Sequence, residues 1–227
     1  MRKTQKPPAF LKKSMAFLFL IFFKVLDTLP FGRYNIYVQY ANRFTGERSI
    51  MEKGNTRSNS ALYTGYNEKN VCGENYAGFS RYCRKAARAV IVEHGKVLLS
   101  HEVNVGQWMI PGGGVEGNET PEECCVREAA EETGLLVKPK SCFLVINEFY
   151  EDWKFVSYYF VCEVEGHMDR NPTKREIEVG AVPEWLEIGQ AAEIFSHYGD
   201  YAGSDEERRG IYLREHLALS EFSDKYN

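Results

Sequence analysis

Three glutamates near the middle of the chain have the type and spacing to bind a metal ion. Glu128, Glu131 and Glu132 stand at i, i+3 and i+4, so on a helix they share one face, with neighbouring Cβ atoms about 5–6 Å apart. Such a cluster repels itself unless a cation neutralises it. Carboxylate oxygens are ligands that Mg²⁺ or Mn²⁺ prefer. We therefore expect a divalent cation between them, against the alternative of a solvated helix face.

The flanking residues predict a helix over 121–133 that would position these glutamates. Thr120 is typical of an N-cap, Pro121 of a first helical residue and Glu123 of a capping box, while Gly134 fits the position that ends a helix. Before this helix, the glycines at 112–114 predict a turn that is neither ordinary helix nor ordinary strand. A carbonyl of this turn could add an oxygen ligand.

Residues 113–135 together resemble the complete Nudix box. Gly113 is followed after five residues by Glu119, and after seven more by the run Arg127-Glu128-Ala129-Ala130-Glu131-Glu132-Thr133-Gly134-Leu135. Every charged and glycine position of the motif is present at its offset. Ala129 stands where the family more often has a larger aliphatic residue, which affects packing and not chemistry. The resemblance extends more loosely from about residue 85 to 198.

The resemblance implies a mixed-sheet α/β/α sandwich and a hydrolase that acts on a nucleoside diphosphate linked to another group. It implies that Glu128, Glu131, Glu132 and the carbonyl of Gly112 hold Mg²⁺ or Mn²⁺. The metal would cancel charge on the diphosphate and acidify the attacking water.

Further roles follow from the same resemblance. Arg127 would pair with Glu119 and brace the loop. Glu131 is our first choice for the general base and Glu128 the second, and Glu176 or Glu178 is the candidate if the base comes from a later loop.

Composition limits the other classes. The chain has 227 residues, 44% hydrophobic content and a formal charge of −4, which is ordinary for a globular protein and offers no electrostatic case for nucleic-acid binding. Its six cysteines form no Cys-x-x-Cys pair and have no histidine spacing suited to zinc, so we expect a reducing, cytoplasmic compartment. The adjacent Cys124 and Cys125 are expected to be buried apolar residues.

The first 84 residues lie outside the resemblance. Residues 1–30 are basic and then apolar, but the uninterrupted apolar run at 15–23 is shorter than the about 20 residues that span a bilayer. Three interpretations stay open: a peripheral membrane contact through residues 10–29, a helix docked on the catalytic domain, or upstream sequence that is not translated, with Met15 or Met51 as the start. Residues 31–84 are polar and predict a poorly ordered connector.

Residues 85–227 predict the catalytic domain. The apolar segments at 89–92 and 97–99 predict a hairpin, 107–110 a short strand before the glycines, and 142–150 with 155–164 a second hairpin. A further strand is expected to end at 185–186, followed by helices at 189–198 and 205–220. The pattern does not predict an oligomeric state.

Substrate choice is only weakly indicated. Tyr150 and Trp153 are candidate substrate contacts because their rings could stack on a base, although strand aromatics more often pack against neighbouring strands. The proline that follows the box in ADP-ribose-cleaving members is missing, and Tyr150 is slightly offset from a tyrosine typical of dinucleoside-polyphosphate members. We favour a sugar-nucleotide or dinucleotide substrate. The alternatives are a non-catalytic nucleotide-sensing module and a membrane-associated scaffold.

Overall fold

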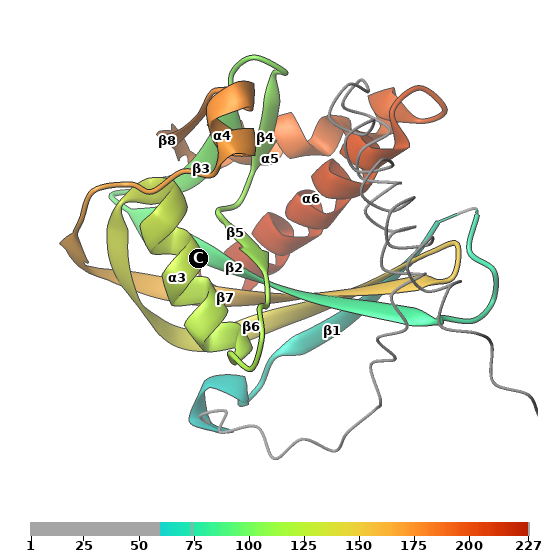
Figure 1. The fold of residues 1–227 in the computed structure, drawn as a ribbon, viewed down its shortest axis with the longest axis horizontal. Coiled ribbons are helices and arrows are strands. Elements are labelled where there is room, and N and C mark those ends of the chain that lie inside the picture. The colour runs from blue at the N-terminus through green and yellow to red at the C-terminus, as the bar shows by residue number, and fades with distance from the viewer. Residues whose placement is uncertain (1–59, 74, 227) are drawn as a thin grey trace, which may run out of the picture. The chain divides into compact units, whose positions relative to one another are not determined.

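The structure is a computed structural model that describes residues 60–73 and 75–226. A mixed β-sheet forms its centre, with helices on both faces (Figure 1). The strands are β1 (Asn67–Cys72), β2 (Tyr82–Glu93), β3 (Lys96–Glu102), β4 (Gln107–Met109), β5 (Gly112–Gly114), β6 (Leu135–Tyr150), β7 (Trp153–His167) and β8 (Ala181–Glu187). The helices are α3 (Pro121–Thr133), α4 (Lys174–Val179), α5 (Ile188–Ser196) and α6 (Glu206–Tyr226), with the 3₁₀ helices η2 (Ser60–Tyr63) and η3 (His197–Tyr201).

The main path of the sheet runs β1-β6-β7-β2-β3-β4, with β5 paired to β2 and β8 paired to β3. Strands β6 and β7 form a long antiparallel hairpin, whereas β7 lies parallel to β2 and β1 parallel to β6. Strands β2 and β3 pair only at Val92–Val97 and Glu93–Lys96. Beyond this short ladder, β2 is free to pair with β5, which brings the glycine-rich segment beside it.

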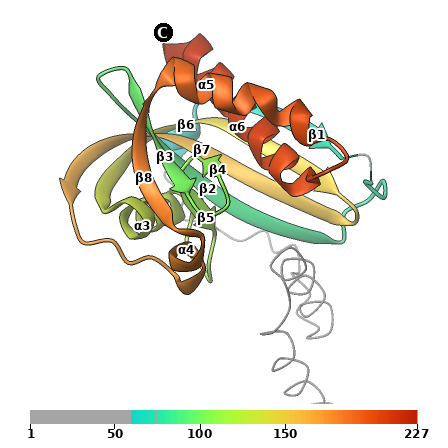
Figure 2. The ribbon, with the colours of Figure 1, turned by 90° about the horizontal axis from the view of Figure 1, so that it is seen from above.

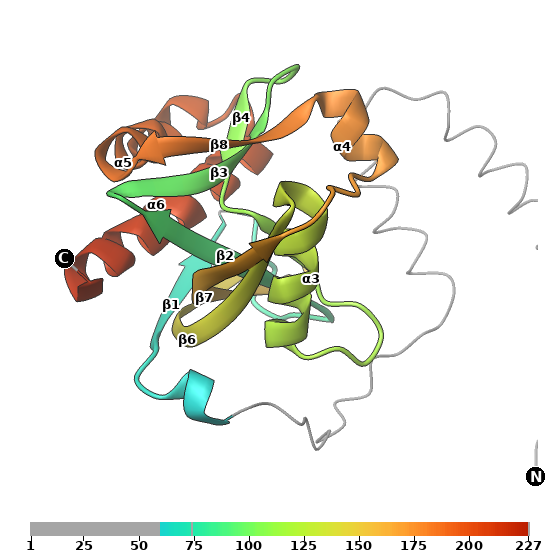
Figure 3. The same ribbon diagram turned by 90° about the vertical axis from the view of Figure 1, so that its left-hand side faces the viewer.

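Alternating side chains give the sheet two apolar faces. On β2, Ala87, Ala89 and Ile91 pack with α3, whereas Val90 belongs to the cluster that contains α5 and α6 residues. Figures 2 and 3 show α3 on one side of the sheet and α5 and α6 on the other. The predicted mixed-sheet α/β/α arrangement is therefore confirmed.

Helix α3 begins and ends where its local sequence predicts. The Thr120 side chain accepts a hydrogen bond from the Glu123 backbone, and the Glu123 carboxylate accepts one from the Thr120 backbone. Gly134 is left-handed, with φ 75°, and donates its N–H to the Ala130 carbonyl. Cys124, Cys125 and Ala129 are fully buried against the sheet, as expected for small apolar residues.

The structure differs from the predicted boundary at residue 84. Part of the expected connector forms β1, which pairs with β6, and β2 already begins at Tyr82. The sequence signal is weak because β1 is mostly polar and mostly exposed. Val71 nevertheless packs against the α5 and α6 side of the core, and Lys69 forms a 2.8 Å ion pair with Glu221 of α6.

The glycine-rich turn also differs from its prediction, because Gly112–Gly114 forms the short strand β5. Its backbone is still special: Gly112 has φ 143°, a conformation that favours glycine.

The interpretations of residues 1–30, including membrane contact through 10–29 and the starts at Met15 or Met51, lie outside the described residues. Within residues 60–73 and 75–226, no helix is both long and apolar enough to cross a membrane.

Candidate active site

The candidate site lies where β5 meets α3. A Cβ atom on Gly112 would clash with the backbone of Ala87, and one on Gly113 would occupy the space filled by the Glu128 carboxylate. Glycine at these two positions therefore allows β5 to pair closely with β2 and allows a glutamate of α3 to lie directly over the β5 backbone.

Arg127 connects this strand, the following loop and the helix. Its guanidinium donates to both carboxylate oxygens of Glu119, at 2.7 and 3.1 Å, and to the Gly114 carbonyl at 3.0 Å. The same group contacts Glu128 at 2.8 Å and Glu131 at 3.3 Å through Nη1. The pairing of Arg127 with Glu119 implied by the family resemblance is thus present, and it fixes the loop between β5 and α3.

Glu132 points to a different part of the same strand. Its Oε2 accepts a hydrogen bond from the Gly112 N–H at 3.1 Å. The Gly112 carbonyl accepts one from Arg88 Nη1 at 2.8 Å, which leaves a second lone pair on that oxygen. The candidate ligands Glu132 and Gly112 are therefore adjacent.

The surroundings of Glu128 and Glu132 disfavour the ionised form of both carboxyl groups. Burial raises the pKa of Glu132 to about 8, with Arg88 acting in the opposite direction. Burial also raises the pKa of Glu128, against the lowering effect of Arg127. By contrast, Glu119 accepts hydrogen bonds from Arg127, and these lower the pKa of the Glu119 carboxyl group. Burial therefore favours the protonated, neutral form of Glu128 and Glu132, and such perturbed pKa values are typical of functional sites.

This donor set suits a hard divalent cation, because it consists of carboxylate oxygens and a backbone carbonyl. Within residues 60–73 and 75–226, however, no three acidic, histidine or cysteine side chains converge tightly enough to form a metal cluster as they stand. Glu128 and Glu131 both turn to Arg127, whereas Glu132 turns to Gly112. A bound cation would have to replace some of these hydrogen bonds and ion pairs of the glutamates.

The two later glutamates lie on α4 rather than in a loop. Glu176 closes a capping box with Thr173, accepting the Thr173 N–H at 2.7 Å, and its charge contributes to the raised pKa of Glu132. Glu178 is exposed, and its backbone carbonyl accepts from Asn104. Of these two glutamates, only Glu176 therefore has a described electrostatic effect on a residue of the candidate site.

Tyr150 and Trp153 lie at the tip of the β6–β7 hairpin and pair with each other. The Tyr150 hydroxyl is buried without a hydrogen-bond partner, and burial raises its pKa to about 12. Trp153 stacks on Tyr82 and on Phe155, with ring centroids 4.8 and 5.7 Å apart. These aromatic residues therefore form a group separate from the α3 glutamates.

Sequence reasoning missed Arg84 and Arg88, which flank the glycine strand on β2. Arg88 donates to the carbonyls of Ile110 and Gly112, and the Arg84 guanidinium lies over Gly114. Their spacing of four residues in a strand places both on one face. That signal was available, but only once β2 was known to extend back to Tyr82.

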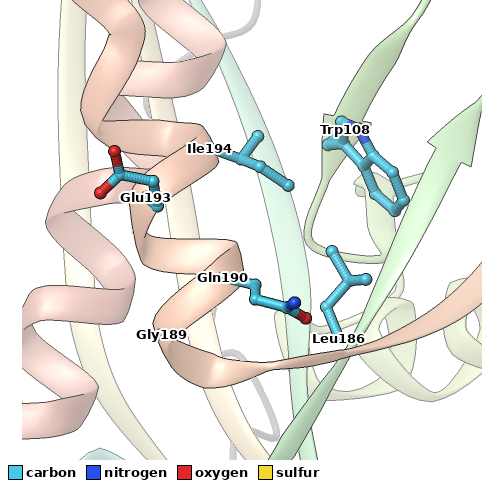
Figure 4. A pocket seen from close by; sticks show the side chains of 6 residues that line it. All are labelled: Trp108, Leu186, Gly189, Gln190, Glu193 and Ile194. Carbon is cyan, nitrogen blue, oxygen red and sulfur yellow. The ribbon is translucent and has the colours of Figure 1, made fainter.

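A separate pocket of about 450 Å³ lies between β4, β8 and α5 (Figure 4). It is lined by Trp108, Leu186, Gly189, Gln190, Glu193 and Ile194. The lining is largely apolar, with one carboxylate and no basic side chain, so it does not suit the negative charge of a diphosphate.

Comparisons with known proteins identify the family of the chain. The NUDIX domain model matches residues 83–204. A mouse protein named diphosphoinositol polyphosphate phosphohydrolase 3-alpha is 32% identical over 99 residues, covering 43% of this chain and 58% of that protein.

Two further matches are an enzyme and a solved structure. An ADP-ribose pyrophosphatase from Methanocaldococcus jannaschii is 38% identical over 86 residues, covering 36% of this chain and 51% of the relative. A solved NUDIX hydrolase from Nitrosomonas europaea has 18% identity and a TM-score of 0.46, covering 62% of this chain and 88% of its own. The chain thus spans just over half the length of these two curated relatives.

Proposed function

We propose, because this chain belongs to the Nudix family, that it is a metal-dependent pyrophosphohydrolase. Family membership follows from the match over residues 83–204, which is more than half of the chain, and it confirms the resemblance read from residues 113–135. The observation that carries the proposal is that two glutamates of α3 lie against the glycine strand: Glu128 fills the space over Gly113, and Glu132 accepts the Gly112 N–H.

In this proposal the ligands are Glu128, Glu131, Glu132 and the carbonyl of Gly112. When bound, Mg²⁺ or Mn²⁺ supplies positive charge against the diphosphate and acidifies the attacking water. Arg127 holds the loop and the helix in register through Glu119 and Gly114.

The remaining role is that of the base. Glu131 takes the proton from the water, with Glu128 as the second candidate; the Glu131 side chain, at 34% exposure, is the more accessible of the two. Glu176 stays a candidate of lower rank because its carboxylate caps α4.

The favoured substrate is a nucleoside diphosphate linked to another group, with a sugar-nucleotide or dinucleotide preferred. An ADP-ribose pyrophosphatase among the relatives supports this choice. A diphosphoinositol polyphosphate is the second candidate, supported by the mouse relative. A nucleotide-sensing module without catalysis is disfavoured by the intact glutamates.

A substrate panel tests the proposal. The purified chain is incubated with ADP-ribose, dinucleoside polyphosphates, a diphosphoinositol polyphosphate and a nucleoside triphosphate, each with Mg²⁺, with Mn²⁺ or with a chelator. Phosphorus-containing products are followed by chromatography and ³¹P NMR. We expect metal-dependent cleavage of a diphosphate bond in the first two classes, and none by the Glu131→Gln variant. Wild-type protein that is folded and inactive on every compound would leave the sensing or scaffold alternatives.

A cytoplasmic location, with membrane contact through residues 10–29, remains a prediction. Cell fractionation of the full chain, alongside a variant that lacks residues 1–30, tests it. If both forms distribute identically, residues 10–29 do not determine the location.

A further inference from the structure

Arg88 of β2 is a buried cation beside the glycine strand β5. The residue is 9% exposed, and two residues on the same face of the sheet, Val90 of β2 and Tyr159 of β7, are fully buried. The acceptors of its guanidinium among the described residues are backbone carbonyls, whereas Arg127 and Arg214 pair with glutamates. A buried charge without a carboxylate partner is costly. The role of Arg88 therefore depends on which carbonyls it holds.

The Arg88 guanidinium bridges the carbonyls on either side of Pro111. Its Nη1 donates to the Ile110 carbonyl at 3.1 Å and to the Gly112 carbonyl at 2.8 Å. The Pro111 carbonyl between them accepts a hydrogen bond from the Ala89 N–H at 2.8 Å. Two neighbouring residues of β2 therefore fix three successive carbonyls where the chain passes from β4 to β5.

Gly112 has a backbone conformation that needs such support. Its φ of 143° is one that residues with a side chain rarely adopt, and glycine loses more conformational freedom on ordering than any other residue. The Gly112 N–H donates to Glu132 Oε2 at 3.1 Å, while the Gly112 carbonyl accepts from Arg88. Both polar groups of this residue are thus held by side chains.

These two side chains approach Gly112 from different faces of the sheet. Arg88 shares a face of β2 with Val90, which packs on the α5 and α6 side. Glu132 belongs to α3, which covers the other side (Figure 3). The connection between Arg88 and the candidate metal ligands therefore runs through the Gly112 backbone, which lies in the sheet itself.

The charge of Arg88 also influences Glu132. Burial raises the pKa of Glu132 to about 8, and the positive charge of Arg88 opposes this rise. A positive charge near the glutamates also repels a metal cation. Arg88 can thus affect metal binding through its charge or through its hydrogen bonds, and a lysine, which keeps the charge, separates the two.

We propose that Arg88 is a positioning residue of the candidate metal site, which holds the Gly112 peptide group so that its carbonyl and the Glu132 carboxylate can bind one cation. This inference rests on the proposed function, because it takes Gly112 and Glu132 as ligands. The Gly112 oxygen keeps a second lone pair for the cation while Arg88 occupies the first. Partners that orient a metal ligand typically change metal affinity about 10–100-fold when they are removed.

The test measures metal binding without turnover. Arg88→Met and Arg88→Lys are made in the full chain. Arg88→Lys keeps the charge, but its ammonium ends one bond short of the Nη1 position and lacks the planar fork. The control is Arg208→Met, because Arg208 also donates to a backbone carbonyl, that of Val105, and also has a buried Nε without a hydrogen-bond partner.

Binding of Mn²⁺ to the substrate-free protein is followed through the EPR signal of the free ion, and thermal melting in a chelator shows that each variant is folded. We expect Arg88→Met to raise the Kd for Mn²⁺ about tenfold or more, and Arg88→Lys to raise it by part of that factor. Arg208→Met should leave the Kd at the wild-type value.

A spectroscopic signal reports on the Gly112 peptide group directly. In ¹⁵N NMR spectra without metal, the Gly112 amide signal should shift in both Arg88 variants. The Gly203 signal is the control, because the Gly203 N–H also donates to a glutamate carboxylate, that of Glu206, and it should not shift. If Arg88→Met does not fold, Arg88→Lys and the Gly112 signal decide the question.

Three outcomes overturn the inference. Mn²⁺ binding in both folded Arg88 variants that equals or exceeds that of wild type would show that the carbonyl contacts do not affect affinity, and the proposed function would stand. Weaker binding in Arg88→Met alone, with wild-type affinity in Arg88→Lys, would assign the effect to charge. A wild type that does not bind Mn²⁺ would instead refute the metal ligands of the proposed function together with this inference.

Discussion

Two arginine–glutamate clusters lie on opposite faces of the same sheet and differ mainly in burial. The turn cluster consists of Arg127 of α3 with Glu119, Glu128 and Glu131. The α6 cluster consists of Arg214 with Glu148 and Glu215, and Tyr159 donates to Glu215 at 3.2 Å. The Arg127 side chain is 26% exposed, whereas Arg214 is 12% and Glu215 0% exposed.

This difference in burial determines whether the residues of a cluster can exchange their ionic and hydrogen-bond partners. In the turn cluster, a cation and water can reach Glu131 and replace contacts with Arg127. In the α6 cluster, any exchange would leave a buried charge without a partner, which is costly. Similar residues therefore suit the proposed catalytic role on one face and a fixed structural role on the other.

The largest expected effect concerns the turn cluster. Glu131→Gln should lower kcat by about 10²–10⁴-fold, the usual contribution of a general base, while leaving the melting temperature near that of wild type. Glu122→Gln on the same helix should change kcat little, because Glu122 accepts a hydrogen bond from Tyr63 and glutamine can still accept it. Equal rates for Glu131→Gln and wild type would remove Glu131 from the mechanism.

In the α6 cluster, substitution should affect stability more than activity. Arg214→Leu removes the cationic partner of the buried Glu148 and Glu215, so we expect the free energy of unfolding to fall by about 3–5 kcal/mol. Arg127→Leu should cost about 1 kcal/mol or less, as for partly exposed pairs, yet reduce activity strongly. Urea unfolding and kcat are measured for both. If Arg127→Leu proves the more destabilising, burial does not explain the difference between the clusters.

The sequence predicted the bounds of α3 and the Arg127–Glu119 pair because their determinants are local. The cap at Thr120, the stop at Gly134 and the glycines of β5 all lie within one short segment, and their spacing places the glutamates of the candidate site. The α6 cluster joins Arg214 to Glu148, 66 residues apart, and depends on how β6 faces α6. Arg84 was missed for the same reason: its position depends on strand pairing between β2, β5 and β7.

Strand β1 offers a direct test of the domain boundary predicted at residue 84. Its backbone pairs with β6 along its whole length, and Asn67 donates to Glu221 of α6. A fragment of residues 60–227 should therefore melt at a higher temperature than one of residues 84–227, which also cuts into β2. Both are compared by circular dichroism and activity. Identical melting and activity would restore the boundary at 84 and make β1 dispensable.

The last prediction is a pH dependence of stability that originates at Glu132, next to the turn cluster. Glu132 has a pKa of about 8 in the folded chain, against 4.5 as the usual value. Between these values the folded state binds the extra proton, so without metal the free energy of unfolding should fall as pH rises from about 4.5 to about 8. Glu132→Gln should flatten that part of the curve.

Added Mg²⁺ should reverse the trend, because a metal binds the deprotonated carboxylate. Stabilisation should grow with pH up to about 8 and reach about 2.7 kcal/mol at 100 times Kd. It should be much smaller in a Glu128→Gln/Glu132→Gln variant. Na⁺ at matched ionic strength is the control, since salt alone screens the repulsion between the glutamates. Thermal shifts that respond to Mg²⁺ equally in both proteins, at every pH, would place the cation elsewhere and leave the raised pKa of Glu132 without a functional meaning.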